Sequence, residues 1–287
     1  MFTQTPTPEP VFPLSPQLVR LTDEEFLTLS NYVKDHYGIN LTKKRGLIEG
    51  RLNQELRRRG FKTFSDYFKV LFADKTGNEM ITLLNRLTTN LSYFMRENEH
   101  FNFLMKQALP AFEKTHATHE LRIWSAGCST GQEAYNTAMV INEYFGARKS
   151  LWKVKILATD LSRQVLAKAE KGVYTPEELK DLPAAWRTKY LIPAEGGNFQ
   201  IAPALRAEVE FKPGNLMEPF QFPRPFDLIF CRNVMIYFDG PTKAKLVKKF
   251  YDCTADGGYL FIGHSESILG TGTQYGYIQP AVYQRKG

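Results

Sequence analysis

The feature that most constrains the fold is an alternation of short apolar runs with amphipathic helical segments, which continues from Leu121 to the end of the chain. Strand-like runs begin at Leu121, Trp152, Phe226 and Tyr259, and a helical segment follows each of the first three. Strands that alternate with helices in this way form a parallel sheet with helices on both faces. The sequence therefore predicts an α/β fold with a doubly wound sheet, closed by a hairpin within residues 275–287.

Residues 18–89 have a different pattern and predict a separate, all-helical domain. Apolar residues recur there with the period of helices, and no stretch after Leu21 alternates as a strand does. Thr22-Asp-Glu-Glu25 has the form of a capping box at the start of the first helix. A second helix is expected from Thr42 to Arg59.

Three further segments complete the predicted organisation. Residues 90–120 form a linker and a connecting helix, and the sheet domain covers residues 121–287. Within it, residues 173–213 are rich in Tyr, Pro and Arg, with a hairpin expected at Gly196-Gly197, and we interpret them as a small inserted β subdomain. Residues 1–17 contain five prolines and predict an extended or disordered lead.

Charge and cysteine content narrow the class of protein. A net charge of +7 and an isoelectric point near 9.1 predict an acidic partner, which charge alone does not identify as protein, lipid or nucleic acid. The three cysteines are scattered without a CxxC pair, and the histidines lack ligand spacing, so no disulfide framework and no metal site is predicted. The sequence has neither a secretory signal nor an apolar run that could cross a membrane, which favours a cytoplasmic protein, with a monomer as the default.

A glycine-containing loop, Ser125-Ala-Gly-Cys-Ser-Thr-Gly131, follows the first strand of the sheet domain. Glycine lets the backbone approach a ligand closely, and the helix that begins near Gln132 presents its N-terminal amides to the same place. Asp160 ends the next strand, where a carboxylate usually accepts hydrogen bonds from ribose hydroxyls. The pair suggests an adenosine-containing cofactor; the alternative is an ordinary strand–helix turn followed by a helix-capping aspartate.

The spacing of this loop distinguishes between classes of cofactor. A dinucleotide needs its pyrophosphate cradled, normally by G-x-G-x-x-G, whereas this loop has G-x-x-x-G. Glu133, just inside the following helix, would repel a pyrophosphate but suits a cofactor that carries positive charge. S-adenosylmethionine has a sulfonium, an ammonium and no phosphate, so the loop favours this cofactor.

Six motifs in the chain carry a more specific signal. They are LTTNLSYFMRE, WSAGCSTGQEAY, ATDLS, GNLMEP, FDLIFCRNVMIYFD and GGYLFIGHSES. In order and spacing they resemble the chemotaxis receptor glutamate O-methyltransferases, the CheR family, from about Leu21 to the C-terminus. The resemblance implies a helical receptor-docking domain, a Rossmann-like class I methyltransferase domain and the β insertion. It also implies S-adenosylmethionine-dependent formation of glutamate methyl esters on the cytoplasmic helices of chemoreceptors, with S-adenosylhomocysteine as the product.

The resemblance also assigns roles to individual residues. Asp160 would hold the ribose, while Asn215 and Leu216 would frame the adenine. Tyr237 and Arg96 would lie next to the transferred methyl group as the catalytic residues. The cofactor contacts that the resemblance implies are Asn90, Ser92, Arg96, Glu133, Asp160, Asn215, Leu216, Cys231, Arg232 and Asn233. Without the resemblance, Tyr237 is interpreted as a buried aromatic residue and Arg96 as a surface cation.

The chain departs from the family pattern at a few positions. Gln132, Ala134 and Asn136 stand where the family more often has GEEPYS, and Met95 replaces a usual Phe. These are first-turn and packing positions, so they leave the chemistry unchanged. The hairpin at Gly196-Gly197 is short compared with members that grip a receptor's C-terminal tether, which leaves tether binding open.

The predicted chemistry explains why the sequence shows no obvious His/Asp dyad. A glutamate side chain has a pKa near ~4.3 and is ionised at neutral pH, so a carboxylate acceptor needs no general base. The enzyme needs only to align the reactants, exclude water and orient the carboxylate. Tyr237 can donate its hydroxyl to the incoming carboxylate, and Arg96 can pair with a carboxylate of cofactor or substrate.

The predicted second helix is strongly basic. Lys44, Arg51, Arg58 and Arg59 fall on one stripe, opposite the apolar residues of the helix. A solvated helix face is the simplest interpretation of such a run. The functional interpretation is a docking surface for acidic methylation helices, which would steer and orient the substrate because each exposed pair contributes less than ~1 kcal/mol.

Two other functions remain open at this stage. A nucleic-acid or small-molecule methyltransferase would suit the positive charge. Against nucleic acid, amine-directed enzymes carry (D/N)-P-P-(Y/F) after the fourth strand, where this chain has Arg232-Asn-Val-Met235. A signalling module that binds the cofactor without turnover is the third hypothesis, and the presence of Tyr237 and Arg96 argues against it.

Overall fold

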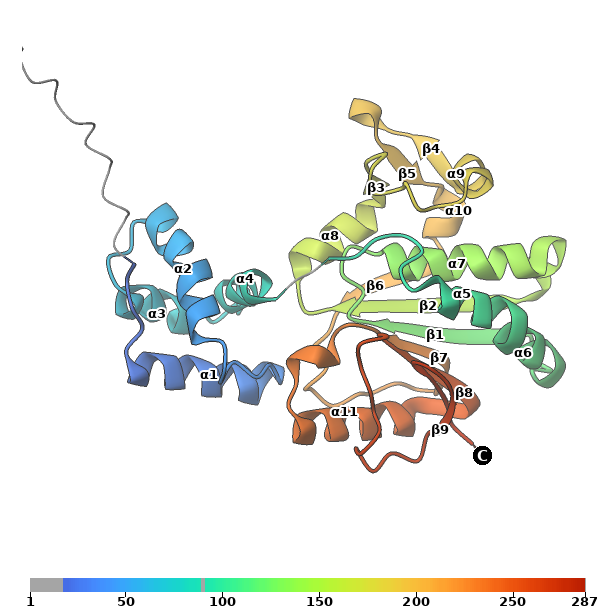
Figure 1. Cartoon of the computed structure of the whole chain (residues 1–287). Coiled ribbons are helices and arrows are strands. Elements are labelled where there is room, and N and C mark those ends of the chain that lie inside the picture. The colour runs from blue at the N-terminus through green and yellow to red at the C-terminus, as the bar shows by residue number, and fades with distance from the viewer. Residues whose placement is uncertain (1–17, 89–90, 287) are drawn as a thin grey trace, which may run out of the picture. The chain divides into compact units, whose positions relative to one another are not determined.

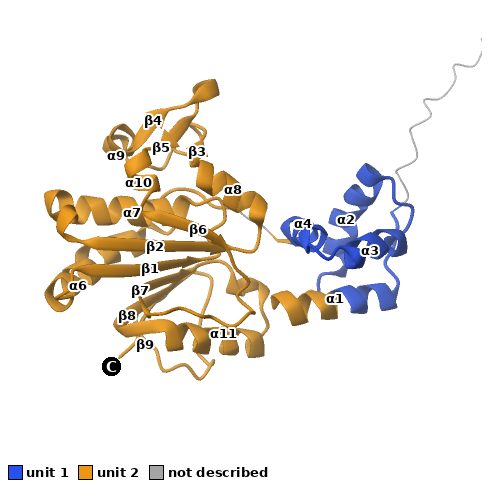
Figure 2. Cartoon of the chain, turned by 180° about the vertical axis from the view of Figure 1, so that it is seen from behind, with its two compact units in different colours: residues 1–29, 42–87 blue, residues 30–41, 88–287 orange. Residues whose placement is uncertain are grey.

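The computed structural model describes residues 18–88 and 91–286, so the predicted proline-rich lead lies outside the described residues. The chain divides into two compact units. Among the described residues, the first unit is built from residues 18–29 and 42–87, and the second from residues 30–41, 88 and 91–286 (Figure 2). Helix α1 (Asp23–Tyr37) therefore contributes to both units.

The first unit is helical, as the sequence predicts. Besides the start of α1 it contains α2 (Arg45–Arg59), α3 (Phe64–Ala73) and α4 (Asn78–Leu87). The capping box is confirmed, because Thr22 N donates to Glu25 Oε2 at 2.8 Å and Glu25 N donates to Thr22 Oγ1 at 3.1 Å. Helix α2 begins at Arg45, later than predicted, because Lys44 has non-helical backbone angles (φ −118°, ψ 18°).

Glu55 is buried on α2 and is surrounded by arginines. Its oxygens lie 2.7 Å from Arg58 Nη2, 2.6 Å from Arg86 Nη2 and 3.9 Å from Arg59 Nη1. The hydrogen bonds from Arg58, together with the charges of Arg86 and Arg59, lower the pKa of Glu55. Two of the four predicted docking residues, Arg58 and Arg59, therefore also neutralise a buried carboxylate of α2. A third, Arg51, donates to the carbonyl oxygen of Arg86 at 2.7 Å.

The second unit is built on a seven-stranded, mostly parallel sheet in the order β6-β2-β1-β7-β8-β10-β9 (Figure 1). Its strands are β1 (Glu120–Ala126), β2 (Lys153–Asp160), β6 (Val209–Pro213), β7 (Phe226–Cys231), β8 (Thr254–Ile262), β9 (Gly276–Gln279) and β10 (Val282–Gln284). Strands β6, β2, β1, β7 and β8 run parallel, and β10 and β9 form the closing antiparallel hairpin. The predicted α/β fold with a doubly wound sheet is confirmed.

Helices cover both faces of this sheet, α7 on one side and α11 on the other (Figure 1). The described helices of the second unit, besides the end of α1, are α5 (Asn98–Phe103), α6 (Leu109–Thr115), α7 (Gln132–Phe145), α8 (Arg163–Lys171), α9 (Ala184–Tyr190), α10 (Pro203–Arg206) and α11 (Gly240–Cys253). Successive residues of a strand point to opposite faces. Thus Ile123 and Phe261 belong to the core that contains α7, whereas Trp124 and Leu260 belong to the core that contains α11. None of the described helices is both long and apolar enough to span a membrane.

The order of the strands reverses between β1 and β7. From β1 the chain continues to β2 and β6 on one side, and then returns to β7 and β8 on the other. Ligands of open α/β sheets bind at such a switch point, beyond the carboxyl ends of the strands. The loops after β1, β2 and β7 therefore surround the expected binding place.

A second, small sheet in the order β3-β5-β4 lies in the segment predicted as an insertion. Its strands are β3 (Val173–Tyr174), β4 (Leu191–Pro193) and β5 (Phe199–Ile201). Strands β4 and β5 flank Gly196-Gly197, as predicted. The prediction was wrong at its end, because β6 pairs with β2 in the main sheet and not with the insertion. Strand β6 has the sequence VEFKP, which lacks the apolar run that identified the other parallel strands.

Candidate active site

The loop after β1 is tied to the end of β2. The N–H groups of Gly127 and Cys128 both donate to the carbonyl oxygen of Thr159, at 2.8 and 2.9 Å. Gly131 has a φ of 95°, and a Cβ there would lie 2.8 Å from Ala169 Cβ, so the position requires glycine. The loop therefore turns tightly and brings the N-terminus of α7 to the carboxyl edge of the sheet.

Asp160 ends β2 beside this loop. Its Oδ2 accepts a hydrogen bond from Ser129 N, and its Oδ1 accepts one from Ser162 N, both at 2.9 Å. Burial raises the pKa of Asp160, although these backbone amides act in the opposite direction. A carboxylate offers about four lone-pair sites, so Asp160 retains capacity to accept hydrogen bonds from hydroxyl groups.

Glu133 lies in the first turn of α7, and its carboxylate is largely buried. Its Oε1 accepts a hydrogen bond from the Ser125 hydroxyl at 2.6 Å, and its Oε2 lies 3.2 Å from Arg232 Nη1. Burial raises the pKa of Glu133, and the charge of Arg232 opposes this shift. A carboxylate in the first turn of the helix would repel a phosphate at this N-terminus.

Arg232 follows β7 and joins three segments of the site. Its side chain is only 3% exposed, and its Nε lies 3.2 Å from Glu97 Oε2. Its Nη1 faces Glu133, and its Nη2 donates to the backbone carbonyl oxygen of Arg96. Burial acts to raise the pKa of Glu97, but Arg232 and the His264 N–H outweigh it, and the pKa is lowered. Arg232 thus connects the linker before α5 to β7 and α7.

The loop that follows β7 is held by the buried carboxylate of Glu266. Its Oε2 accepts hydrogen bonds from Asn233 N at 2.9 Å and Gly263 N at 2.6 Å, and its Oε1 accepts one from Ile236 N at 3.1 Å. Asn233 has a φ of 59°, in the left-handed region that asparagine tolerates. The carboxylate therefore fixes the conformation of the loop that carries Tyr237.

The two residues predicted beside the methyl group lie on separate segments. Arg96 belongs to the linker, and its Nη1 donates to the carbonyl oxygen of Leu91 at 2.6 Å. Tyr237 is half-buried in the short 3₁₀ turn η4 (Met235–Tyr237), where its carbonyl oxygen accepts a hydrogen bond from Asn40 N at 2.8 Å. Arg96 reaches Arg232 through its backbone only, so the described contacts place its guanidinium at the linker.

Of three other predicted cofactor residues, the structure describes two. Ser92 is half-buried in the linker, and Asn90 lies outside the described residues. Cys231 is fully buried at the end of β7, and burial raises the pKa of its thiol well above the ordinary value. A thiol in this state is a poor nucleophile, so the side chain of Cys231 serves packing.

Asn215 and Leu216 follow β6. Asn215 Nδ2 donates to the carbonyl oxygen of His36 at 2.9 Å, and Asn215 Oδ1 accepts a hydrogen bond from Met217 N at 2.9 Å. Lys249 Nζ donates to the carbonyl oxygen of Leu216 at 2.6 Å. The segment predicted to frame the adenine is therefore held by hydrogen bonds between side chains and the main chain, with partners in α1 and α11.

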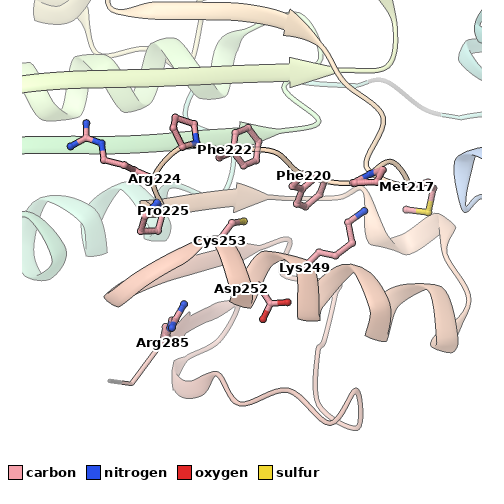
Figure 3. A pocket seen from close by; sticks show the side chains of 11 residues that line it. Met217, Phe220, Phe222, Arg224, Pro225, Lys249, Asp252, Cys253 and Arg285 are labelled. Carbon is pink, nitrogen blue, oxygen red and sulfur yellow. The ribbon is translucent and has the colours of Figure 1, made fainter.

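A groove of about 630 Å³ lies next to this segment, between residues 217–225 and the C-terminal half of α11 (Figure 3). Lys249 reaches across it, and its Nζ lies 4.1 Å from the centre of the Phe220 ring. Burial lowers the pKa of Lys249. The described lining residues include none of the predicted cofactor residues, so this groove is separate from the candidate site.

The donor set at the switch point fits S-adenosylmethionine. Asp160 and Glu133 stand on either side of the glycine loop, so a pyrophosphate there would meet two carboxylates. Ribose hydroxyls and a cationic group would instead meet hydrogen-bond acceptors and negative charge. Asp160 and Glu133 would hold these two parts of the cofactor.

Comparison with known proteins places this arrangement in a family. Residues 24–88 match the family model described as CheR methyltransferase, all-alpha domain, and residues 90–283 match the one described as CheR methyltransferase, SAM binding domain. The chain belongs to the CheR methyltransferase family. This confirms the resemblance drawn from the six motifs, and with it S-adenosylmethionine as the cofactor.

Three relatives named as chemotaxis protein methyltransferases align with nearly the whole chain. The protein from Borreliella burgdorferi is 43% identical over 93% of this chain and 96% of its own length. The one from Escherichia coli is 37% identical over 86% of each chain, and one from Pseudomonas aeruginosa is 36% identical over 92% of this chain and 93% of its own. The function predicted from the sequence, S-adenosylmethionine-dependent methylation in chemotaxis, is confirmed at this level.

Two residues that the sequence reasoning missed are Glu97 and Glu266. Glu266 follows β8 at the same sheet edge as Arg232, so the rule that strand ends carry ligand-binding residues could have identified it. Glu97 lies in the linker, in the sequence MRENEH, where no periodicity marks it. Its role depends on tertiary contact with Arg232, which the sequence does not reveal.

Proposed function

We propose that this CheR-family enzyme transfers the methyl group of S-adenosylmethionine to glutamate side chains on the cytoplasmic helices of chemoreceptors, forming methyl esters. The observation that carries this proposal is the alignment of almost the entire chain with relatives named as chemotaxis protein methyltransferases. The net charge of +7 supports an acidic protein partner. Action on the cytoplasmic part of a receptor implies that the enzyme works in the cytoplasm.

The residues of the site would contribute alignment and charge to this reaction. The bound cofactor supplies an electrophilic methyl group. Asp160 accepts hydrogen bonds from the ribose, while Arg232 keeps Glu133 and the linker in place. Tyr237, on the loop fixed by Glu266, donates its hydroxyl to the incoming carboxylate, and Arg96 pairs with a carboxylate. The acceptor is already ionised at neutral pH, so no residue has to remove a proton.

Transfer of a radiolabelled methyl group tests the class of acceptor. The purified enzyme is incubated with labelled S-adenosylmethionine, a receptor cytoplasmic fragment and total RNA or DNA. The proposal predicts label on the receptor fragment that mild base releases, because methyl esters hydrolyse under these conditions. Base-stable label, or label on nucleic acid, indicates another methyltransferase class, and retained cofactor binding without any label indicates a non-catalytic module.

Replacing Tyr237 by Phe should slow methyl transfer by about 10- to 100-fold, the effect of losing one hydrogen bond to a charged group of about 1.5–3 kcal/mol. The ring remains, so the packing of η4 and the affinity for S-adenosylmethionine should stay unchanged. Single-turnover rates and calorimetric affinities measure the two effects separately. An undiminished rate would remove the Tyr237 hydroxyl from the mechanism.

We also propose that the acidic receptor helices dock on the basic stripe, which consists of Lys44 with Arg51, Arg58 and Arg59 of α2. The contacts of Arg51 and Arg59 make them poor choices for a test, because both bind other parts of the helical unit. Lys44 and Arg58 are better, since Glu55 keeps its ion pair with Arg86 at 2.6 Å when Arg58 is replaced.

The double variant Lys44→Gln/Arg58→Gln should raise the KM for a receptor fragment several-fold, because each exposed pair contributes less than about 1 kcal/mol. The kcat and the cofactor affinity should not change. Lys69→Gln/Lys180→Gln is the matched control, which removes two exposed charges elsewhere. An equal rise of KM in both double variants would mean that only net charge matters and that α2 has no docking role.

A further inference from the structure

Three potential metal ligands, two from the start of α5 and one from the distant loop after β8, meet next to the candidate site. Glu97, His100 and His264 each offer a donor atom within 4.8 Å of the others. His100 Nδ1 lies 3.6 Å from Glu97 Oε2, and the rings of His100 and His264 are 4.9 Å apart between centroids. All three belong to the second unit, where α5 contributes His100 and the loop after β8 contributes His264.

His100 is the unusual member of this cluster. Its side chain is 0% exposed, and neither ring nitrogen has a hydrogen-bond partner. Buried polar groups are nearly always hydrogen-bonded, so a buried imidazole without a partner points to a ligand at that place.

The surroundings of the cluster favour a cation. Arg232 is in contact with both Glu97 and Glu133, and Glu266 binds the next residue, Asn233. Glu97 and Glu133 therefore share one guanidinium, while Glu266 lies against the backbone of the neighbouring residue. A carboxylate offers about four lone-pair sites, so Glu97 can bind an ion and keep Arg232 as a partner. The exposed side chain of His264 leaves the cluster accessible from solvent.

We propose that Glu97, His100 and His264 form a binding site for a divalent transition metal, with Zn²⁺ as the best match. Two imidazoles and a carboxylate are a ligand set that zinc takes in proteins, with a water molecule in the fourth position. Ligands bound at about 2.0–2.2 Å from one ion lie closer together than the described donors do, so the exposed His264 ring must move inward. The sequence alone predicts no metal site, because only tertiary packing brings His264 to Glu97 and His100.

The test is calorimetric titration of the untagged, full-length protein with ZnCl₂, together with titration with Co²⁺ followed by visible absorption. The proposal predicts one saturable equivalent of Zn²⁺ and visible cobalt bands typical of nitrogen and oxygen ligands in a site of low coordination number. His264→Ala should weaken zinc binding at least tenfold and abolish the cobalt bands. His36→Ala, which removes an exposed histidine elsewhere, should bind as the unaltered protein does.

The two histidine variants distinguish a specific metal site from non-specific binding of metal ions to exposed histidines. His264 is exposed, so its replacement should leave the fold intact, which circular dichroism checks. Absence of saturable binding, or equal affinity in His264→Ala and the unaltered protein, would overturn the proposal. Equal losses in His264→Ala and His36→Ala would overturn it as well.

Discussion

Arg232→Met should destabilise the second unit by about 3–5 kcal/mol, the usual cost of removing one partner of a buried ion pair. The side chain of Arg232 is 3% exposed, and its loss leaves Glu97 and Glu133 facing one another without the positive charge between them. The three tryptophans, Trp124, Trp152 and Trp186, all lie in this unit, so urea unfolding followed by tryptophan fluorescence reports on it directly.

Two further variants make this experiment specific. Adding Glu97→Gln to Arg232→Met removes one of the two carboxylate charges that have lost Arg232 as their partner. The double variant should therefore recover part of the lost free energy of unfolding. Arg122→Met is the control, because Arg122 is another arginine of the main sheet, on β1. Its side chain donates to the carbonyl oxygens of Pro225 and Arg224 at the opposite edge of the sheet. A loss in Arg232→Met no larger than that in Arg122→Met would show that the ion pairs do not hold the site together.

Asp160→Asn should weaken binding of S-adenosylmethionine and of S-adenosylhomocysteine by about 10- to 100-fold each. A hydrogen bond to a charged group contributes about 1.5–3 kcal/mol, and the amide also replaces one acceptor atom by a donor. The loss should be equal for both ligands, because they share the ribose and differ at the sulfur. Isothermal titration calorimetry measures both affinities.

The control for this prediction is Asp227→Asn. Asp227 lies near the amino end of β7. Its Oδ2 accepts a hydrogen bond from Arg122 N at 2.7 Å, and its Oδ1 lies 3.0 Å from His116 Nε2. It is therefore a buried strand carboxylate at the edge of the sheet opposite to the one where the cofactor would bind. Unchanged affinity in Asp160→Asn, or an equal loss in Asp227→Asn, would contradict the placement of the ribose.

The parallel sheet could be predicted because its central strands are buried on both faces and therefore read as apolar runs. Strand β7, FDLIFC, is buried throughout, and its apolar sequence predicts a strand. The edge strand β6 has mostly polar or exposed residues, so its sequence does not identify it as a strand of the main sheet. The position of Arg232 at a strand end was likewise visible in the sequence. Its ion pair with Glu97 was not, because it depends on how the linker folds back over the sheet edge.

The most direct test of the proposed chemistry is to locate the transferred methyl group on the acceptor. A receptor cytoplasmic fragment is incubated with the enzyme and S-adenosylmethionine that carries an isotope-labelled methyl group, and its peptides are sequenced by tandem mass spectrometry. We predict that the label lies on glutamate side chains and disappears after mild alkali. Label on lysine, on arginine or on the peptide backbone would contradict the account.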